Sequence, residues 1–149
     1  HQGTYNANPL TAVAGAACLE RIADGAAQRR CDELAAGLRA GFNEALARRD
    51  LPGFAWGESS VFHVALGMTC ENRTAGDLRM PIGPTAAALK ASPATRQGAL
   101  LYPGMLLEGV DLFSGGGMLS AAHTEAEVDA AVAAFDRVLG RMETEGAFA

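Results

Sequence analysis

The 149-residue chain has few cationic side chains and no long apolar run. Its 12 Lys and Arg residues are outnumbered by 17 Asp and Glu residues, so the formal net charge is −5. Nucleic-acid-binding domains usually carry a basic patch, and we therefore expect no nucleic acid partner. A transmembrane helix needs about 20 consecutive apolar residues. No stretch of the sequence reaches this length, so no membrane partner is expected either.

Cysteine is scarce, and its spacing matches none of the common cysteine motifs. Cys18, Cys31 and Cys70 form an odd set without a C-x-x-C pair, which favours reduced, buried thiols in a cytoplasmic protein. Histidine is scarce as well, and no second histidine or carboxylate stands at metal-ligand spacing from His63. The sequence therefore predicts no metal site.

Lysine is the scarcest charged residue, because Lys90 is the only one in the chain. A lysine that forms a Schiff base needs a dry site that lowers its pKa. Lys90 instead ends an alanine-rich segment beside Ser92 and Pro93, where exposure to solvent is expected. We assign no catalytic residue within the chain.

Apolar residues recur at helical spacing in three long segments. The first helix is expected from Pro9 to about Ala23, with Asn8 as its N-cap. The second is expected from about Ala26 to Arg49, and the last follows a capping box formed by Thr124 and Glu127. The tail after the last helix, residues 143–149, is expected to fray.

The pattern changes to a period of two after the second helix. Strands are predicted at 54–56 and 60–66, with Phe62 on the core face and His63 on the other face. His63 could face a ligand, but a hydrogen-bonded sheet histidine is the favoured interpretation. Residues 68–92 read as a loop that carries a short helix at 85–90.

The last third of the chain combines a helix with a glycine-rich turn. A third helix is predicted at 94–108, kinked or split at Pro103 because proline removes a helical hydrogen bond. Strands at 110–113 and 118–121 would then form a hairpin around the turn Ser114-Gly115-Gly116-Gly117. His123 follows this hairpin, where a structural role is favoured over a place in a substrate cleft. These segments together predict an α+β fold with a small antiparallel sheet covered by helices.

The first ten residues, HQGTYNANPL, carry the strongest functional signal. Gly3 and Thr4 stand just before a capped helix, where backbone N–H groups and the helix dipole can hold an anion. A Gly-Thr turn alone is more often structural. The whole segment, however, resembles the H-x-G-T-[FY]-x-x-N-P-[LI] segment of class III (fold-type I) pyridoxal-phosphate-dependent aminotransferases. The resemblance is greatest to the glutamate-1-semialdehyde aminomutase branch, and it returns at 107–112 and 117–124.

This resemblance implies a role for the chain within a longer enzyme. In the family, the residues that match Gly3 and Thr4 contact the phosphate of pyridoxal 5'-phosphate bound to the neighbouring subunit of a homodimer. The substrates are amino acids and keto or semialdehyde compounds, and the Schiff-base lysine precedes the Gly-Thr segment. We therefore expect a fragment that is not catalytic alone. Residues 1–25 would be the phosphate-contact segment and connector helix, and residues 26–149 the small C-terminal domain.

Two questions about the function stay open. In the aminomutase pattern an acidic residue stands before the Gly-x-[Met/Leu]-Ser strand, where this chain has Gly115. This difference speaks against isomerisation of glutamate semialdehyde. The alternative from another class is a non-catalytic α+β interaction domain that uses the alanine-rich first helix as its partner surface.

Overall fold

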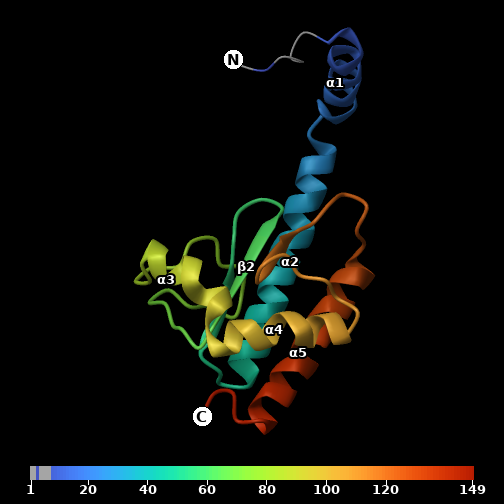
Figure 1. Ribbon diagram of the computed structural model, residues 1–149. Helices are drawn as coiled ribbons and strands as arrows, with labels where there is room; N and C mark the ends of the chain where they lie inside the picture. Colours follow the sequence, from blue (N-terminus) through green and yellow to red (C-terminus); the bar gives the residue numbers. More distant parts are fainter. Residues whose placement is uncertain (1–2, 4–7) are drawn as a thin grey trace.

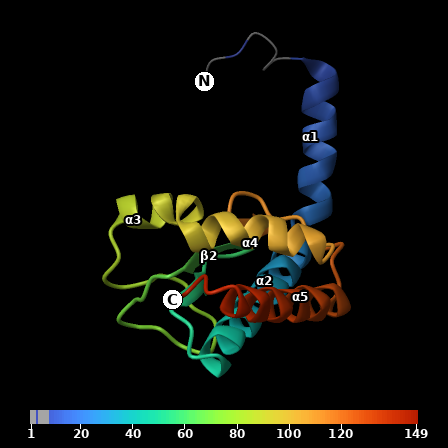
Figure 2. The same ribbon diagram turned by 60° about the horizontal axis from the view of Figure 1, so that its bottom comes forward.

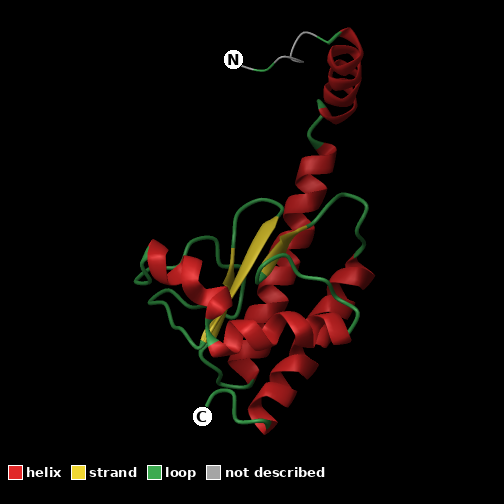
Figure 3. Cartoon of the chain, in the orientation of Figure 1, coloured by secondary structure: helices red, strands yellow, loops and turns green. Residues whose placement is uncertain are grey.

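The computed structural model describes residue 3 and residues 8–149. The elements follow the chain as shown in Figure 1: α1 (Pro9–Ile22), α2 (Ala26–Arg48), β1 (Gly53–Trp56), β2 (Val61–Leu66), α3 (Ala86–Ala91), the 3-10 turn η1 (Ser92–Ala94), α4 (Arg96–Leu107), β3 (Gly116–Met118) and α5 (Glu125–Thr144). The predicted α+β fold is confirmed, and so are the bounds of the first two helices to within one residue. Figure 3 shows the small sheet among the helices.

Helix α1 projects from the rest of the molecule in both views (Figures 1 and 2). It has no buried residue, and its apolar side chains Leu10, Val13 and Leu19 are exposed. It continues into α2 through a short turn in which Gly25 adopts a left-handed conformation with φ of 71°. A glycine suits this position because other residues pay a steric cost there.

The core lies between α2, α5 and one face of the sheet. Phe42 of α2 stacks on Phe135 of α5 with ring centroids 4.1 Å apart. Phe62 of β2 meets Phe42 edge to face at 6.0 Å. All three rings are buried, and burial of each contributes about 1.5–3 kcal/mol. The alternation predicted for β2 is correct here, because Phe62, Val64 and Leu66 all belong to this core.

The sheet has three antiparallel strands in the order β1-β2-β3. The edge of β1 is covered by a side chain of α2. Asn43 accepts a hydrogen bond from the Ala55 N–H (2.7 Å) and donates one to the Ala55 carbonyl (2.9 Å). Its amide therefore takes the place of a neighbouring strand at a buried position.

The long loop after β2 is fastened to α2 by buried polar residues. Asn43 also donates to the Gly76 carbonyl at 2.8 Å. Arg39, which is 2% exposed, binds Asp77 through Nε at 2.6 Å and donates to two carbonyls at the start of β2. The short helix predicted in this loop is confirmed as α3, with Thr85 as its N-cap.

The predicted glycine-rich hairpin is wrong in its details. Residues 110–113 form no strand. Phe113 instead faces Gly116 in a tight turn in which Ser114 and Gly115 both have positive φ. Gly116 and Gly117 lie in β3 rather than in the turn, because β3 runs too close to β2 for side chains. A Cβ at Gly116 would lie 2.3 Å from the Phe62 carbonyl oxygen, and one at Gly117 would lie 2.7 Å from the Phe62 ring.

Three further expectations can be compared with the structure. Helix α4 runs through Pro103 without a break, so the split that was one of the two expectations for Pro103 does not occur. The tail after α5 packs instead of fraying: Ala147 is buried, and its carbonyl accepts a hydrogen bond from Gln97 at 2.9 Å. The cysteines are not buried as expected, since Cys18 is exposed and the other two are partly exposed. No helix in the described part of the chain is long and apolar enough to cross a membrane.

Candidate functional site

Of the two predicted phosphate contacts, only one lies in the described part of the chain. Thr4 lies outside the described residues, whereas Gly3 is described and is exposed. The N-terminus of α1 is already satisfied from within. Asn8 Oδ1 accepts from the N–H groups of Leu10 (3.0 Å) and Thr11 (3.3 Å), and Pro9 has no N–H to offer. An anion held at this end must therefore bind residues that precede Asn8.

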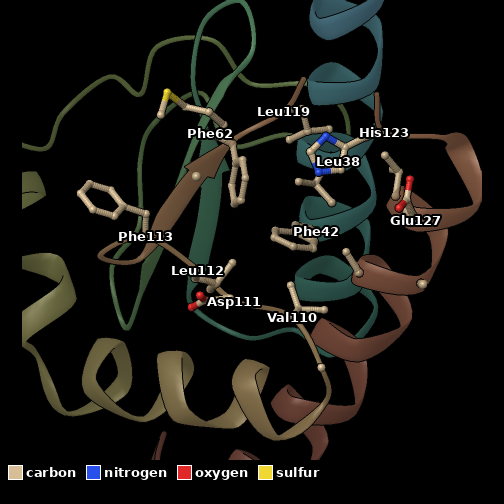
Figure 4. A pocket seen from close by; sticks show the side chains of 16 residues that line it. Leu38, Phe42, Phe62, Val110, Asp111, Leu112, Phe113, Leu119, His123 and Glu127 are labelled. Atoms are coloured by element: carbon tan, nitrogen blue, oxygen red, sulfur yellow. The ribbon is translucent and has the colours of Figure 1, made fainter. Parts of the chain in front are cut away.

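One cavity of the domain lies between α2, α5 and the β3 strand. Its volume is about 570 Å³, within the range of small-molecule sites. Its lining residues come from α2, β2, the segment before β3, β3 itself and the start of α5 (Figure 4): Leu38, Phe42, Phe62, 109–113, 117–119, His123, Glu127, Val128, Ala130 and Ala131. The sequence analysis did not predict this cavity, because it is formed by elements far apart along the chain.

Apolar side chains make up most of the cavity wall. Phe42 and Phe62 form its floor together with Leu38 and Leu119, and all four are at least nine-tenths buried. Phe113 differs, because its ring is 81% exposed and points away from this floor (Figure 4). The wall suits an apolar group, and such a group would be desolvated there.

His123 contributes an imidazole to the cavity, but its ring is held by the turn before α5. Its Nδ1 accepts from the Ser120 N–H at 3.0 Å and lies 3.1 Å from the Ser120 hydroxyl. The Ser120 carbonyl lies 3.3 Å from the same nitrogen, so the Ser120 residue fixes the orientation of the ring. The favoured structural role of His123 agrees with these hydrogen bonds, and the ring also lines the cavity, while its place in a substrate cleft stays a prediction.

Glu127 brings a carboxylate to the same wall, and the predicted capping box is confirmed. The Thr124 N–H donates to Glu127 Oε2 at 2.7 Å, and the Thr124 hydroxyl donates to it at 3.1 Å. The backbone hydrogen bond from Thr124 is the main cause that lowers the pKa of Glu127. Glu127 is thus a stable carboxylate that caps α5, and its basicity is reduced.

Asp111 lies at the opposite rim, close to Tyr102 of α4. Its negative charge and its hydrogen bond raise the pKa of the Tyr102 hydroxyl, the charge having the larger effect. The rim of the cavity therefore carries two carboxylates above an apolar floor. The polar groups of the cavity are engaged in hydrogen bonds that hold the fold. The cavity therefore offers a bound molecule an apolar surface and fixed polar groups, and none of the described groups is left free for proton transfer.

His63 and the single lysine, Lys90, line a second cleft. His63 and Trp56 are cross-strand partners, with ring centroids 5.0 Å apart. None of the described residues hydrogen-bonds to the His63 ring, so the favoured interpretation of a hydrogen-bonded sheet histidine is wrong. Lys90 is exposed, and it lines this cleft of about 340 Å³. Within the described ranges, no group of His, Cys, Asp and Glu residues could hold a metal ion.

Comparison with solved structures gives matches of fold that include two transaminases. One is an omega-transaminase from Sphaerobacter thermophilus, with 28% identity and a TM-score of 0.67 over 94% of this chain and 30% of that chain. The other is a transaminase with PLP bound, with 26% identity and a TM-score of 0.68 over 98% of this chain and 30% of that chain. The chain has the fold of the C-terminal part of a transaminase.

The match covers nearly all of this chain and less than a third of each neighbour, so the chain spans about 30% of the length of these transaminases. No protein-family model and no curated protein matches the sequence. The likeness therefore rests on structure, and it agrees with the family suggested by the decapeptide.

Proposed function

We propose that this chain is the C-terminal portion of a pyridoxal-phosphate-dependent transaminase that acts on an amino acid. The observation that carries the proposal is the fold match, which includes α1 as well as the globular part because 94–98% of the chain is covered. A chance match of a small α+β domain would not be expected to include a projecting helix in the same place. The independent resemblance of residues 1–10 to a cofactor-phosphate segment supports the same function.

In this proposal, Gly3 and Thr4 contact the cofactor phosphate of the neighbouring subunit in a homodimer. Gly3 has no side chain and is exposed, so its backbone N–H is accessible to a phosphate oxygen. The hydroxyl of Thr4 is a second donor of suitable size. Because Asn8 satisfies the N–H groups of α1, the short segment before Asn8 must supply the contact itself. These residues fit a phosphate contact, although they do not form a complete cofactor site.

The cofactor supplies an electron sink that stabilises negative charge at the substrate's reacting carbon. The lysine that carries it must come from elsewhere in the protein, because Lys90 is exposed to solvent, whereas a Schiff-base lysine requires a dry environment. The role of this chain is to bind and orient. Its cavity has an apolar floor and carboxylates at the rim, and we assign no proton transfer to these groups.

Transamination is preferred over an aminomutase reaction. The aminomutase pattern has an acidic residue at the position of Gly115. Gly115 adopts a φ of 78° in the tight turn, and a Cβ there would lie 3.2 Å from Pro93. A carboxylate side chain at this position would require a left-handed backbone conformation that L residues rarely adopt and a small shift of Pro93. Both neighbours reported above are transaminases, which favours the same choice.

The proposal is tested in the longer protein that contains this chain, purified with its cofactor. Thr4→Val removes the hydroxyl and preserves the shape, and we expect cofactor affinity to fall about tenfold, as for a hydrogen bond to a charged group. Thr4→Ser should retain most of the affinity. Thr11→Val is the matched control, because Thr11 is exposed on α1 outside the contact segment.

Two results would contradict the proposal. If Thr4→Val binds pyridoxal phosphate as tightly as Thr4→Ser, the phosphate contact is wrong. If the longer protein neither binds the cofactor nor transfers an amino group, the domain is a non-catalytic interaction module instead. Amino transfer is measured as conversion of a keto acid to an amino acid in the presence of an amine donor.

A further inference from the structure

The outer face of the sheet carries a row of aromatic side chains that ends in an open cleft. Phe54 and Trp56 of β1 lie 5.4 Å apart, and the ring of Trp56 lies 5.0 Å from that of His63, tilted by 35°. Phe54 is fully buried under Leu78. Trp56 is only partly buried and His63 is exposed, so this end of the aromatic row is accessible.

The cleft is closed on its other sides by α3 and by the turn before β3. Leu89 and Lys90 of α3 form one wall, and Phe113 and Ser114 form another. Its volume of about 340 Å³ is at the lower end for ligand sites. A molecule with one ring and a small substituent would fill it, whereas a dinucleotide would not.

The electrostatics of the cleft are opposite to those of the chain as a whole. The chain has a net charge of −5, yet Lys90 is the only charged residue among those that line the cleft. Within the described part of the chain, Lys90 forms no ion pair. Its ammonium group is therefore available to an anion, and no carboxylate of the cleft competes for it.

His63 adds a polar group without adding charge. Although part of the His63 side chain is exposed, partial desolvation of its imidazole lowers its pKa and favours the neutral ring. A neutral imidazole offers one N–H donor and one acceptor. Because its nitrogens have no hydrogen-bond partner among the described residues, they can meet a polar substituent on a bound ring.

From these observations we infer that the cleft is a binding site for a planar aromatic carboxylate. The ring would lie against Trp56 and His63, and its carboxylate would meet the ammonium group of Lys90. Stacked or tilted aromatic pairs gain from ring contact beyond the area they bury, and a charge-assisted hydrogen bond adds orientation. This site is separate from the cofactor contact at Gly3 and Thr4, and it does not depend on the proposed function.

The test uses the fluorescence of Trp56, which is the only tryptophan in the chain. The longer protein that contains this chain is titrated with benzoate, with benzamide as the neutral planar analogue and cyclohexanecarboxylate as the non-planar anion, and its Trp56→Phe variant identifies the part of the emission that comes from Trp56. We expect saturable change in Trp56 emission with benzoate, and affinity about tenfold weaker for each analogue. Absence of saturable binding of benzoate up to millimolar concentration would overturn the inference.

Variants then locate the carboxylate. Lys90→Met should weaken benzoate about tenfold while leaving benzamide unchanged, and Lys90→Arg should restore most of the affinity. Arg21→Met is the matched control, because it removes one exposed positive charge on α1, far from the cleft. Equal weakening by Arg21→Met and Lys90→Met would show a general charge effect and refute the site. The thermal unfolding of each variant, followed by circular dichroism, shows whether its fold is intact.

Discussion

Removal of the Asn43 amide should be among the most destabilising single changes in this domain. Asn43 is 2% exposed and makes three hydrogen bonds, at 2.7, 2.9 and 2.8 Å, to the two backbone groups of Ala55 and to the Gly76 carbonyl. In Asn43→Ala, the N–H and the carbonyl of Ala55 lose their partners at a residue that is fully buried.

The magnitude follows from these two orphaned groups. An unsatisfied buried donor or acceptor costs about 1–3 kcal/mol, and the Gly76 carbonyl is exposed enough to find water. We therefore expect the free energy of unfolding to fall by about 3–4 kcal/mol, which is a large part of the 5–15 kcal/mol typical of a domain. Urea unfolding followed by circular dichroism and Trp56 fluorescence measures the change.

The matched control is Asn72→Ala in the loop after β2. Asn72 also bridges backbone groups, donating to the Met80 carbonyl and accepting from the Ile82 N–H, both at 2.8 Å. These bonds lie at the surface, where water can replace them, so the expected loss is below about 1 kcal/mol. If both variants lose the same stability, or if Asn43→Ala loses less than about 1 kcal/mol, the reasoning from burial is refuted.

Two further predictions concern α5 and α4. The hydrogen bond from Arg49 is the main cause that lowers the pKa of Asp136. The ionised Asp136 therefore stabilises the folded state above the pKa of an unfolded Asp, near 4, and this stabilisation is lost as the pH falls through the lower pKa of the folded state. Asp136→Asn should lower the free energy of unfolding by about 1 kcal/mol at pH 7, and its stability should fall less than that of the wild type below pH 4. If the stability of the variant falls with decreasing pH as steeply as that of the wild type, the assignment is contradicted. Pro103→Ala restores a backbone N–H in the interior of α4, where Pro103 is exposed, so stability should rise by about 1–2 kcal/mol. A lower melting temperature for Pro103→Ala would show that α4 needs the proline.

The parts of the fold that could be predicted from sequence are those set by local signals. Asn8-Pro9 and the Thr124–Glu127 box mark helix starts because the side chain and the backbone it caps are only two or three residues apart. The period-two pattern of β2 likewise reports its own buried face. Each of these features depends on residues close together along the chain, so the sequence contains them directly.

The failures came from contacts between distant segments. The glycines at 116 and 117 look like a turn, yet they are needed because β3 passes close to Phe62. Trp56, His63 and Lys90 come together in one cleft because the sheet and α3 place them there. No local sequence pattern reveals this arrangement. The cavity beside His123 was missed for the same reason. His123 could be recognised as a possible cleft residue from its position, whereas the opposite wall of the cavity comes from residues far away along the chain.

The pairing of α2 with α5 has a consequence for how the domain folds. Ion pairs join α2 and its C-cap Arg49 to α5 across 87 to 95 positions of sequence: Arg30–Glu125, Arg48–Asp136, Arg49–Asp136 and Arg49–Glu143. Closing such a loop costs only about 2 kcal/mol more than closing one of about ten residues, so the cost to stability is small. The cost in time is larger, because contacts distant in sequence slow folding. During synthesis, α2 leaves the ribosome long before α5, so the side of α2 that packs on α5, including Phe42 against Phe135, lacks this partner after β1 and β2 have already emerged.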